Sequence, residues 1–510
     1  MIQIPTQEVA EEILLTTTYS AFLVKSYLFG ATFLTQSLYS PAVCFLGCLV
    51  LQLLWKHHDN PMEDHIATHK RESSSINLIY NCFCHTILAT HSSSRSSNSS
   101  DHLFNTTFMF ILTSLCASSL RLSPSRNHLF YLYSFLFTFT AVFSFSFFDT
   151  FTIANVYNSL FFTAAFAAAF HAFLFTTGRS FSVGESALLA QLCALLWSTE
   201  IPQQLPLPII SCLLVTKLTS IFFTFLTTIT HLFQQNPTHS FYATLVLLTP
   251  AFTAYHITPI SLIALSLQSF SSYNFSIHTI LLLAYWLLLC LCCFYFTTRA
   301  ASASSLRTVT RKVYHVFLLL VFVPGLILDP LLLLFCSSIL TCVFFITSLI
   351  IAYKIPPLGE LLSEAVKPYT SSQDTGQFVL TPVYLLLGSS SPLWLHYYRF
   401  SSGLIVNINQ PHLPIAVYSG LLSVGVGDAV ASVVGSKYGK RKVFGTNKTL
   451  EGVAASVVSQ MGVLFLFHLF LGYTFHLWHL FTVVVVSLAE LVTTEIDNLV
   501  LPLLMYMLLM

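Results

Sequence analysis

Long apolar runs, separated by short polar segments, dominate the pattern of the chain. A bilayer core of about 30 Å requires roughly 20 apolar residues for each spanning helix. The candidate spans are residues 35–55, 103–120, 128–148, 151–177, 180–198, 206–232, 240–268, 275–297, 313–328, 331–353, 377–396, 413–435, 453–473 and 477–494. A final apolar segment, 499–510, is shorter, and we expect a partial or tilted element there. Few runs alternate with period two, so we predict an all-α polytopic membrane protein with about 12–15 transmembrane helices.

Composition narrows the class of protein further. Charged residues make up 8% of the 510 residues, whereas a typical soluble protein carries about 25%. Hydrophobic residues make up 55%, and the mean hydropathy is +0.75. These values exclude a soluble protein of this size, a disordered chain and a nucleic-acid-binding protein.

Charge divides the chain into two regions. Residues 127–298 contain five charged side chains, whereas residues 299–510 contain 21. We therefore expect residues 1–298 to form a multi-span membrane scaffold and residues 299–510 to form the catalytic region. The basic segments at 299–312 and 437–448 are separated by four predicted crossings, so they should share one face of the membrane. Basic residues favour the cytosolic side, which predicts that this face is cytosolic.

Glycine and charge are most concentrated in residues 425–452. A helix over 420–436 would place Asp428 and a series of small residues on one face. Small residues at this spacing are also typical of close helix packing. Packing explains neither the acid, which would cost about 2.5–3.5 kcal/mol near the centre of a span, nor the five basic residues within 437–448. Phosphate binding explains both features, because cations and backbone N–H groups stabilise phosphate oxygens.

The same run resembles a known signature. Asp428-x-x-Ala431-x-x-x-Gly435-x-x-x-Gly439, followed by Asn447-Lys448-Thr449-x-Glu451-Gly452, is similar to the CTP-binding signature of the dolichol kinase family. The resemblance extends over roughly residues 305–505 and includes Arg311-Lys312-x-x-His315, Asp374-Thr-Gly376 and Glu495-x-Asp497-Asn498. One position departs from the pattern, because Asn447 stands where the family often has a lysine.

The resemblance implies transfer of the γ-phosphoryl group of CTP to the terminal hydroxyl of dolichol or a related polyprenol. The products would be CDP and dolichyl phosphate, which serves protein glycosylation. The family works in the endoplasmic reticulum membrane with its nucleotide site facing the cytosol. The implied partners are a lipid substrate and Mg²⁺ or another divalent cation, with no nucleic acid.

The expected roles follow the motif. Catalytic roles fall to Asp428, Lys448 and Glu451, and we expect Asp428 and Glu451 to hold the metal or to orient the hydroxyl. The predicted CTP-binding residues are Gly435, Ser436, Gly439, Lys440, Arg441, Lys442, Gly445, Thr446, Asn447, Lys448 and Thr449. Further candidates to line the site are Arg311, Lys312, His315, Asp374, Glu495 and Asp497.

Three alternatives stay open at this point. A phosphatidate cytidylyltransferase has a similar nucleotide motif, but that family has a further basic and acidic signature downstream, and residues 452–510 contain no Lys or Arg. A phytol-type kinase differs only in its prenol. A transporter, which would not be an enzyme, typically spreads charge across midplane helices and often shows inverted repeats.

Overall fold

The computed structural model describes mainly the C-terminal part of the chain. The described residues are 183–198, 207–233, 276–300, 307–366, 378–401, 413–443, 448–493 and 496–510, with isolated positions before residue 182. The predicted spans before residue 180, the span 240–268 and the residues Asp374, Gly445, Thr446, Asn447 and Glu495 lie outside this part.

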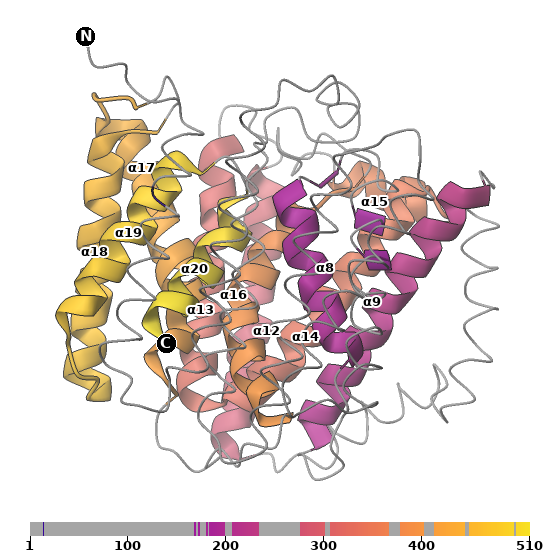
Figure 1. Cartoon of the computed structure of the whole chain (residues 1–510), viewed down its shortest axis with the longest axis horizontal. Coiled ribbons are helices and arrows are strands. Elements are labelled where there is room, and N and C mark those ends of the chain that lie inside the picture. The colour runs from indigo at the N-terminus through magenta and orange to yellow at the C-terminus, as the bar shows by residue number, and fades with distance from the viewer. Residues whose placement is uncertain are drawn as a thin grey trace, which may run out of the picture. The chain divides into compact units, whose positions relative to one another are not determined.

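The chain divides into two compact units. The first, Met1–Thr199 with Thr375–Gln377, includes helix α8 (Val183–Ser198). The second, Glu200–Asp374 with Phe378–Met510, is a bundle of helices (Figure 1). Its elements are α9 (Leu207–Phe233), α12 (Ile277–Ala300), α13 (Arg307–Leu328), α14 (Pro330–Ala352), α15 (Leu358–Val366), α16 (Thr381–Ser401), the 3₁₀ turn η3 (Ile415–Tyr418), the π-helix η4 (Leu421–Asp428), α17 (Ala429–Tyr438), α18 (Leu450–Leu471), α19 (Leu477–Val492) and α20 (Asp497–Leu509).

The predicted fold class is confirmed in the described residues, whose regular elements are all helical. In the part of the chain that the structure describes, four helical segments are long and apolar enough to cross a membrane: Ile277–Phe296, Pro330–Ala352, Ile415–Tyr438 and Leu450–Leu471. On α12, large apolar side chains such as Leu281 and Phe294 are 60% and 70% exposed, as expected of a surface that faces lipid. The chain is therefore a polytopic membrane protein.

Helix α14 illustrates how closely the hydrophobic pattern locates a span. The predicted range 331–353 corresponds to Pro330–Ala352. Asp329 caps the helix, because its Oδ1 accepts a hydrogen bond from the backbone N–H of Leu332 at 3.1 Å, and proline occupies the first helical position. The other carboxylate oxygen accepts from Thr279 Oγ1 at 3.0 Å, which ties α14 to α12.

Two local predictions need correction. Residues 354–376, which the pattern leaves between the predicted spans 331–353 and 377–396, contain the helix α15, whose leucines at 358, 361 and 362 have helical spacing. The segment expected as one helix over 420–436 is instead a π-helix, η4, followed by an α-helix, α17, that begins at Ala429.

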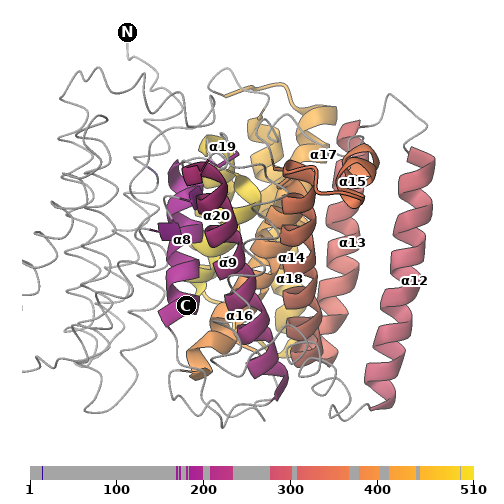
Figure 2. The same ribbon diagram turned by 90° about the vertical axis from the view of Figure 1, so that its right-hand side faces the viewer.

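The basic segments lie at one end of the second unit. Figure 2 shows the C-terminal end of α12, the N-terminal end of α13, α15 and the C-terminal end of α17 together at the same end of the bundle. The described residues of the segments 299–312 and 437–448 therefore lie at one end of this bundle, and their common membrane face stays a prediction.

Candidate active site

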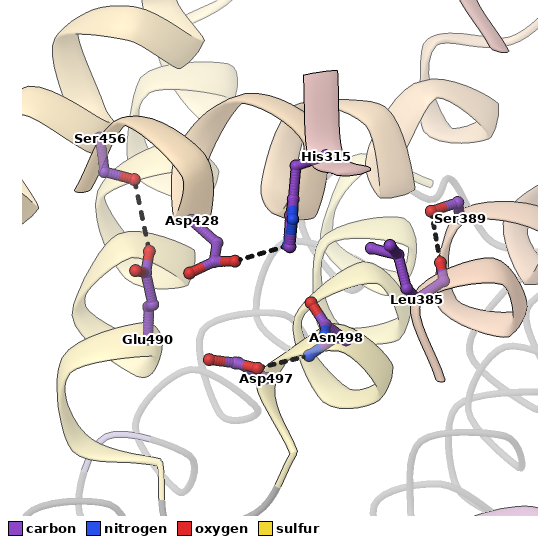
Figure 3. A network of polar contacts seen from close by, with 8 residues as sticks. All are labelled: His315, Leu385, Ser389, Asp428, Ser456, Glu490, Asp497 and Asn498. Carbon is purple, nitrogen blue, oxygen red and sulfur yellow. Dashed lines mark hydrogen bonds and ion pairs between the residues drawn. The ribbon is translucent and has the colours of Figure 1, made fainter. Parts of the chain in front are cut away.

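Asp428 is the central residue of the site. It is the last residue of η4, and it is 6% exposed. Its Oδ2 lies 3.0 Å from Nε2 of His315 on α13, which is also 6% exposed (Figure 3). This distance is that of an ion pair between a carboxylate and a protonated imidazole.

The π-helix η4 brings Asp428 to α13. A Cβ added to Gly425 would lie 2.5 Å from Leu319 Cδ2, so the glycine lets Leu319 of α13 pack directly against η4. Leu319 and His315 are four residues apart and share a face of α13. One π-helical segment therefore positions both the apolar contact and the Asp428–His315 pair, in keeping with the frequent occurrence of π-bulges at functional sites.

A second carboxylate, that of Glu490, faces the same space. Glu490 lies near the end of α19 and is 9% exposed. In Figure 3, Asp428 lies between His315 and Glu490. Glu490 lies outside the signature residues and outside the candidates predicted from the sequence. The signal was an ionisable side chain inside an apolar helix, which is rare and marks function in membrane proteins.

A buried polar network joins α18 to α19 beside this carboxylate. Ser456 Oγ donates to Glu490 Oε2 over a long 3.5 Å. Gln460 Nε2 donates to Ser456 Oγ at 2.9 Å and to Ser487 Oγ at 3.1 Å, and Ser487 Oγ donates to Ser456 Oγ at 3.1 Å. A Cβ at Gly427 would lie 2.5 Å from Gln460 Nε2. The network therefore packs directly against the turn that carries Asp428.

The start of α20 supplies two more polar residues. Asp497 Oδ1 accepts a hydrogen bond from the backbone N–H of Asn498 at 2.9 Å. Asn498 is 8% exposed, and its Oδ1 has no hydrogen-bond partner among the described residues. In Figure 3 its side chain points toward the Asp428–His315 pair. Gly388 of α16 fixes this backbone, because a Cβ there would lie 1.7 Å from the Asn498 carbonyl oxygen.

The signature run forms a hairpin between α17 and α18. The backbone N–H of Val443 donates to the Lys448 carbonyl at 3.2 Å, and that of Leu450 donates to the Arg441 carbonyl at 3.1 Å. A Cβ at Gly439 would lie 2.5 Å from Thr449 Cγ2, so glycine permits the close approach. The small residues at 435 and 439 thus serve the packing of α17 against the start of α18.

The hairpin carries the basic side chains at the surface. Ser436, Lys437, Lys440, Arg441 and Lys442 are all exposed. Thr449 is the N-cap of α18, and its Oγ1 accepts from the Gly452 backbone N–H at 3.2 Å. The chain thus presents cations and the N-terminus of a long helix together, which is a combination that attracts phosphate.

Glu451 organises the hairpin. Its Oε2 accepts hydrogen bonds from the backbone N–H groups of Lys440 and Arg441, each at 3.2 Å. These residues follow the C-terminal end of α17, whereas Asp428 precedes its first residue, and the ten residues of this helix span about 15 Å at a rise of about 1.5 Å per residue. The structure does not bring Asp428 and Glu451 together.

Lys448 connects the hairpin to the buried cluster. Its Nζ donates to the backbone carbonyl oxygen of Glu490. This carbonyl belongs to the last turn of α19, where lysine side chains favourably bind carbonyl groups that the helix leaves unsatisfied. The candidate phosphate ligand therefore lies next to Glu490.

Two further predictions concern the basic pair Arg311 and Lys312 and the presence of a metal site. Arg311 and Lys312 lie in the N-terminal half of α13, one turn before His315. Among the described residues, no three His, Cys, Asp or Glu side chains converge as a self-contained metal centre would require.

These features define a class of protein: a polytopic membrane protein with a buried acidic cluster beside a basic, glycine-rich hairpin. No family model matches the chain, and no solved structure matches it. Curated proteins, in contrast, do match the chain. The chain is 37% identical over 208 residues to a dolichol kinase of Bos taurus, covering 40% of this chain and 38% of the relative.

Other relatives extend the comparison across eukaryotes. A dolichol kinase of Schizosaccharomyces pombe is 34% identical over 203 residues, covering 39% of this chain and 38% of the relative. One of Arabidopsis thaliana is 34% identical over 210 residues, covering 40% and 35%. The matched part of the chain is homologous to dolichol kinases, and the match spans less than two fifths of the length of each of these relatives.

Proposed function

We propose that the chain is a CTP-dependent dolichol kinase. The observation that carries the proposal is the buried Asp428–His315 pair directly beside a basic hairpin, in a protein homologous over two fifths of its length to dolichol kinases. Transfer of the γ-phosphoryl group of CTP to the hydroxyl of dolichol would give dolichyl phosphate and CDP. This product is the lipid on which protein glycosylation depends.

The two substrates differ in polarity, and the site offers a matching surface to each. The exposed cations of the hairpin and the N-terminus of α18 suit a triphosphate. The buried cluster is surrounded by apolar helices, which suits the head of a long prenol. The residues we assign to CTP are those of the signature, with Lys448 at the boundary between the two surfaces.

Phosphoryl transfer requires few covalent roles from the protein. The hydroxyl oxygen forms a bond to the γ-phosphorus, the bond between that phosphorus and the bridging oxygen of CDP breaks, and the hydroxyl proton passes to a carboxylate. Catalysis therefore consists mainly of positioning and charge stabilisation. His315 holds the Asp428 carboxylate in place at 3.0 Å.

The oxygen donors around Asp428 fit a hard divalent cation. Mg²⁺ is commonly held by one or two carboxylates together with substrate phosphates, so the lack of three converging ligands among the described residues agrees with a cation that arrives with the nucleotide. Asp428, Asp497 and the buried Asn498 Oδ1 would hold it. The cation would neutralise phosphate charge. We keep Glu451 out of this set because of its distance from Asp428.

The location follows from the proposed function. Dolichol phosphorylation places the chain in the endoplasmic reticulum membrane. Basic segments favour the cytosolic side, so we place the end of the bundle with the hairpin in the cytosol.

A lipid-labelling assay tests the proposal. Membranes that contain the full chain are supplied with dolichol, Mg²⁺ and CTP labelled at the γ-phosphate, with labelled ATP and with phosphatidate as parallel controls. We expect a labelled lipid that requires dolichol and CTP. Formation of a CDP-lipid from phosphatidate and CTP would identify a cytidylyltransferase instead, and the lack of both products from folded protein would contradict the proposed enzyme.

A further inference from the structure

Glu490 is a buried carboxylate on an apolar helix. Its neighbours on α19 include Val486, Ala489 and Leu491, which are 1%, 3% and 5% exposed. A carboxylate in such surroundings is costly unless it is hydrogen-bonded and serves a purpose. Its side chain accepts a hydrogen bond from Ser456 of the neighbouring helix α18.

The surroundings of Glu490 hold its side chain in one orientation. Ser456, Ser487 and Gln460 are 0%, 0% and 1% exposed and are hydrogen-bonded to one another. Ser456 Oγ then donates to the Glu490 carboxylate over a long 3.5 Å (Figure 3). A chain of fixed side chains of this kind is how active sites hold a reactive group in the required geometry.

The position of Glu490 relative to the two substrate surfaces indicates which substrate it meets. The hairpin cations that suit phosphate are exposed at the end of the bundle, whereas Glu490 lies among buried aliphatic side chains. A carboxylate repels phosphate oxygens, but it is a strong acceptor for a hydroxyl donor. The alcohol is the reactant that brings such a donor into apolar surroundings.

We propose that Glu490 is a catalytic residue that acts on the lipid alcohol, an assignment that rests on the proposed kinase function. Its carboxylate accepts the hydrogen bond of the prenol hydroxyl. It takes that proton as the oxygen–phosphorus bond forms and the phosphorus–oxygen bond to CDP breaks. Ser456 is a positioning residue that acts through Glu490.

The test compares Glu490→Gln, Glu490→Asp and the matched control Glu360→Gln in the purified full chain. Glu360 is exposed on α15 and also changes from acid to amide. We measure kcat and KM with dolichol, and CTP binding separately from the rise in Tm that CTP causes. General-base catalysis is typically worth about 100-fold or more, so Glu490→Gln should lower kcat by about that factor while leaving CTP binding and Tm unchanged.

Two further variants separate chemistry from folding. Glu490→Asp keeps a carboxylate on a shorter stem and should recover part of the lost kcat. Ser456→Ala keeps Glu490 but removes its hydrogen bond, and should lower kcat with dolichol without changing CTP binding. If Glu490→Gln does not fold, Glu490→Asp and Ser456→Ala test the assignment in its place.

The opposing outcomes are distinct. Wild-type kcat in folded Glu490→Gln would overturn the assignment, and so would an equal loss of CTP binding, which would place Glu490 at the nucleotide. If Glu490→Gln does not fold, wild-type kcat in Ser456→Ala would overturn it instead. Failure of the wild-type chain to label dolichol at all would overturn the proposed function itself.

Discussion

The hairpin between α17 and α18 and the buried cluster around Asp428 lie side by side but are built differently. The hairpin is exposed, carries the cations and is held by backbone hydrogen bonds. The cluster is buried, carries the carboxylates and is held by side chains from several helices (Figure 3). Exposed charges are screened by water and salt, whereas buried ones interact strongly. The difference suggests that the hairpin binds the nucleotide and the cluster carries out the chemistry.

Two glutamates make the same contrast on a smaller scale. Glu451 lies in the first turn of α18 and bonds backbone N–H groups of the hairpin. Glu490 lies in the last turn of α19 and faces Asp428 (Figure 3). Both residues are glutamates, so residue type does not distinguish their roles. They differ in how deeply they are buried and in which groups they bond.

Replacing the lysine that joins the two regions should have the largest effect. Lys448→Ala removes a cation from the nucleotide surface and a donor from the Glu490 carbonyl. We expect transfer to fall by about 100-fold or more, because a positioned charge at the reacting phosphate is worth that much. The comparison variant is Lys440→Ala, which removes an exposed charge and should cost far less. Wild-type transfer by well-expressed Lys448→Ala would contradict the assignment of Lys448 to the nucleotide surface.

The glycine contacts of the hairpin predict an effect on stability. Gly439→Ala would place a Cβ 2.2 Å from the Gly435 carbonyl oxygen, and overpacking of this kind costs about 1–3 kcal/mol. Tm should fall and KM for CTP should rise. Gly462→Ala on α18 is the matched control, because a Cβ there has no heavy atom within 4 Å. Equal Tm values for the two variants would contradict the close packing of the hairpin.

Glu451→Gln should have the smallest effect. The change weakens the acceptor for two backbone donors on an exposed loop, where water can replace the lost hydrogen bonds. We expect KM for CTP to rise about tenfold or less with kcat close to that of the wild type, measured by the labelling assay over a range of CTP concentrations. A loss of kcat as large as that of Glu490→Gln would instead support a metal-binding role for Glu451.

The hydrophobic pattern predicted the described fold well because spans in a membrane must be apolar and of nearly fixed length. The range 477–494 anticipated α19, Leu477–Val492, and 453–473 anticipated α18, Leu450–Leu471. The pattern missed α15 because charged residues interrupt its few leucines. It also missed the π-helix η4, because a π-helical turn depends on packing against the neighbouring helix and not on local periodicity.

The site was predictable only where the sequence keeps its residues close together. The signature identified Asp428 and Lys448, and both lie at the cluster. It also grouped Glu451 with Asp428, because spacing along the chain does not show that α17 separates them. Glu490 lies 62 positions after Asp428 and meets it only through the packing of α18 and α19 against η4, so no local motif reveals it.

The most direct test of the buried cluster is the rate of γ-phosphoryl transfer from CTP to dolichol by Asp428→Asn in the full chain. CTP-dependent Tm is measured on the same preparation, to show that the variant is folded. The amide keeps the shape of the side chain but removes the charge beside His315, so we expect transfer to fall by about 100-fold or more. Wild-type transfer by a folded Asp428→Asn protein would contradict the placement of the chemistry at this cluster.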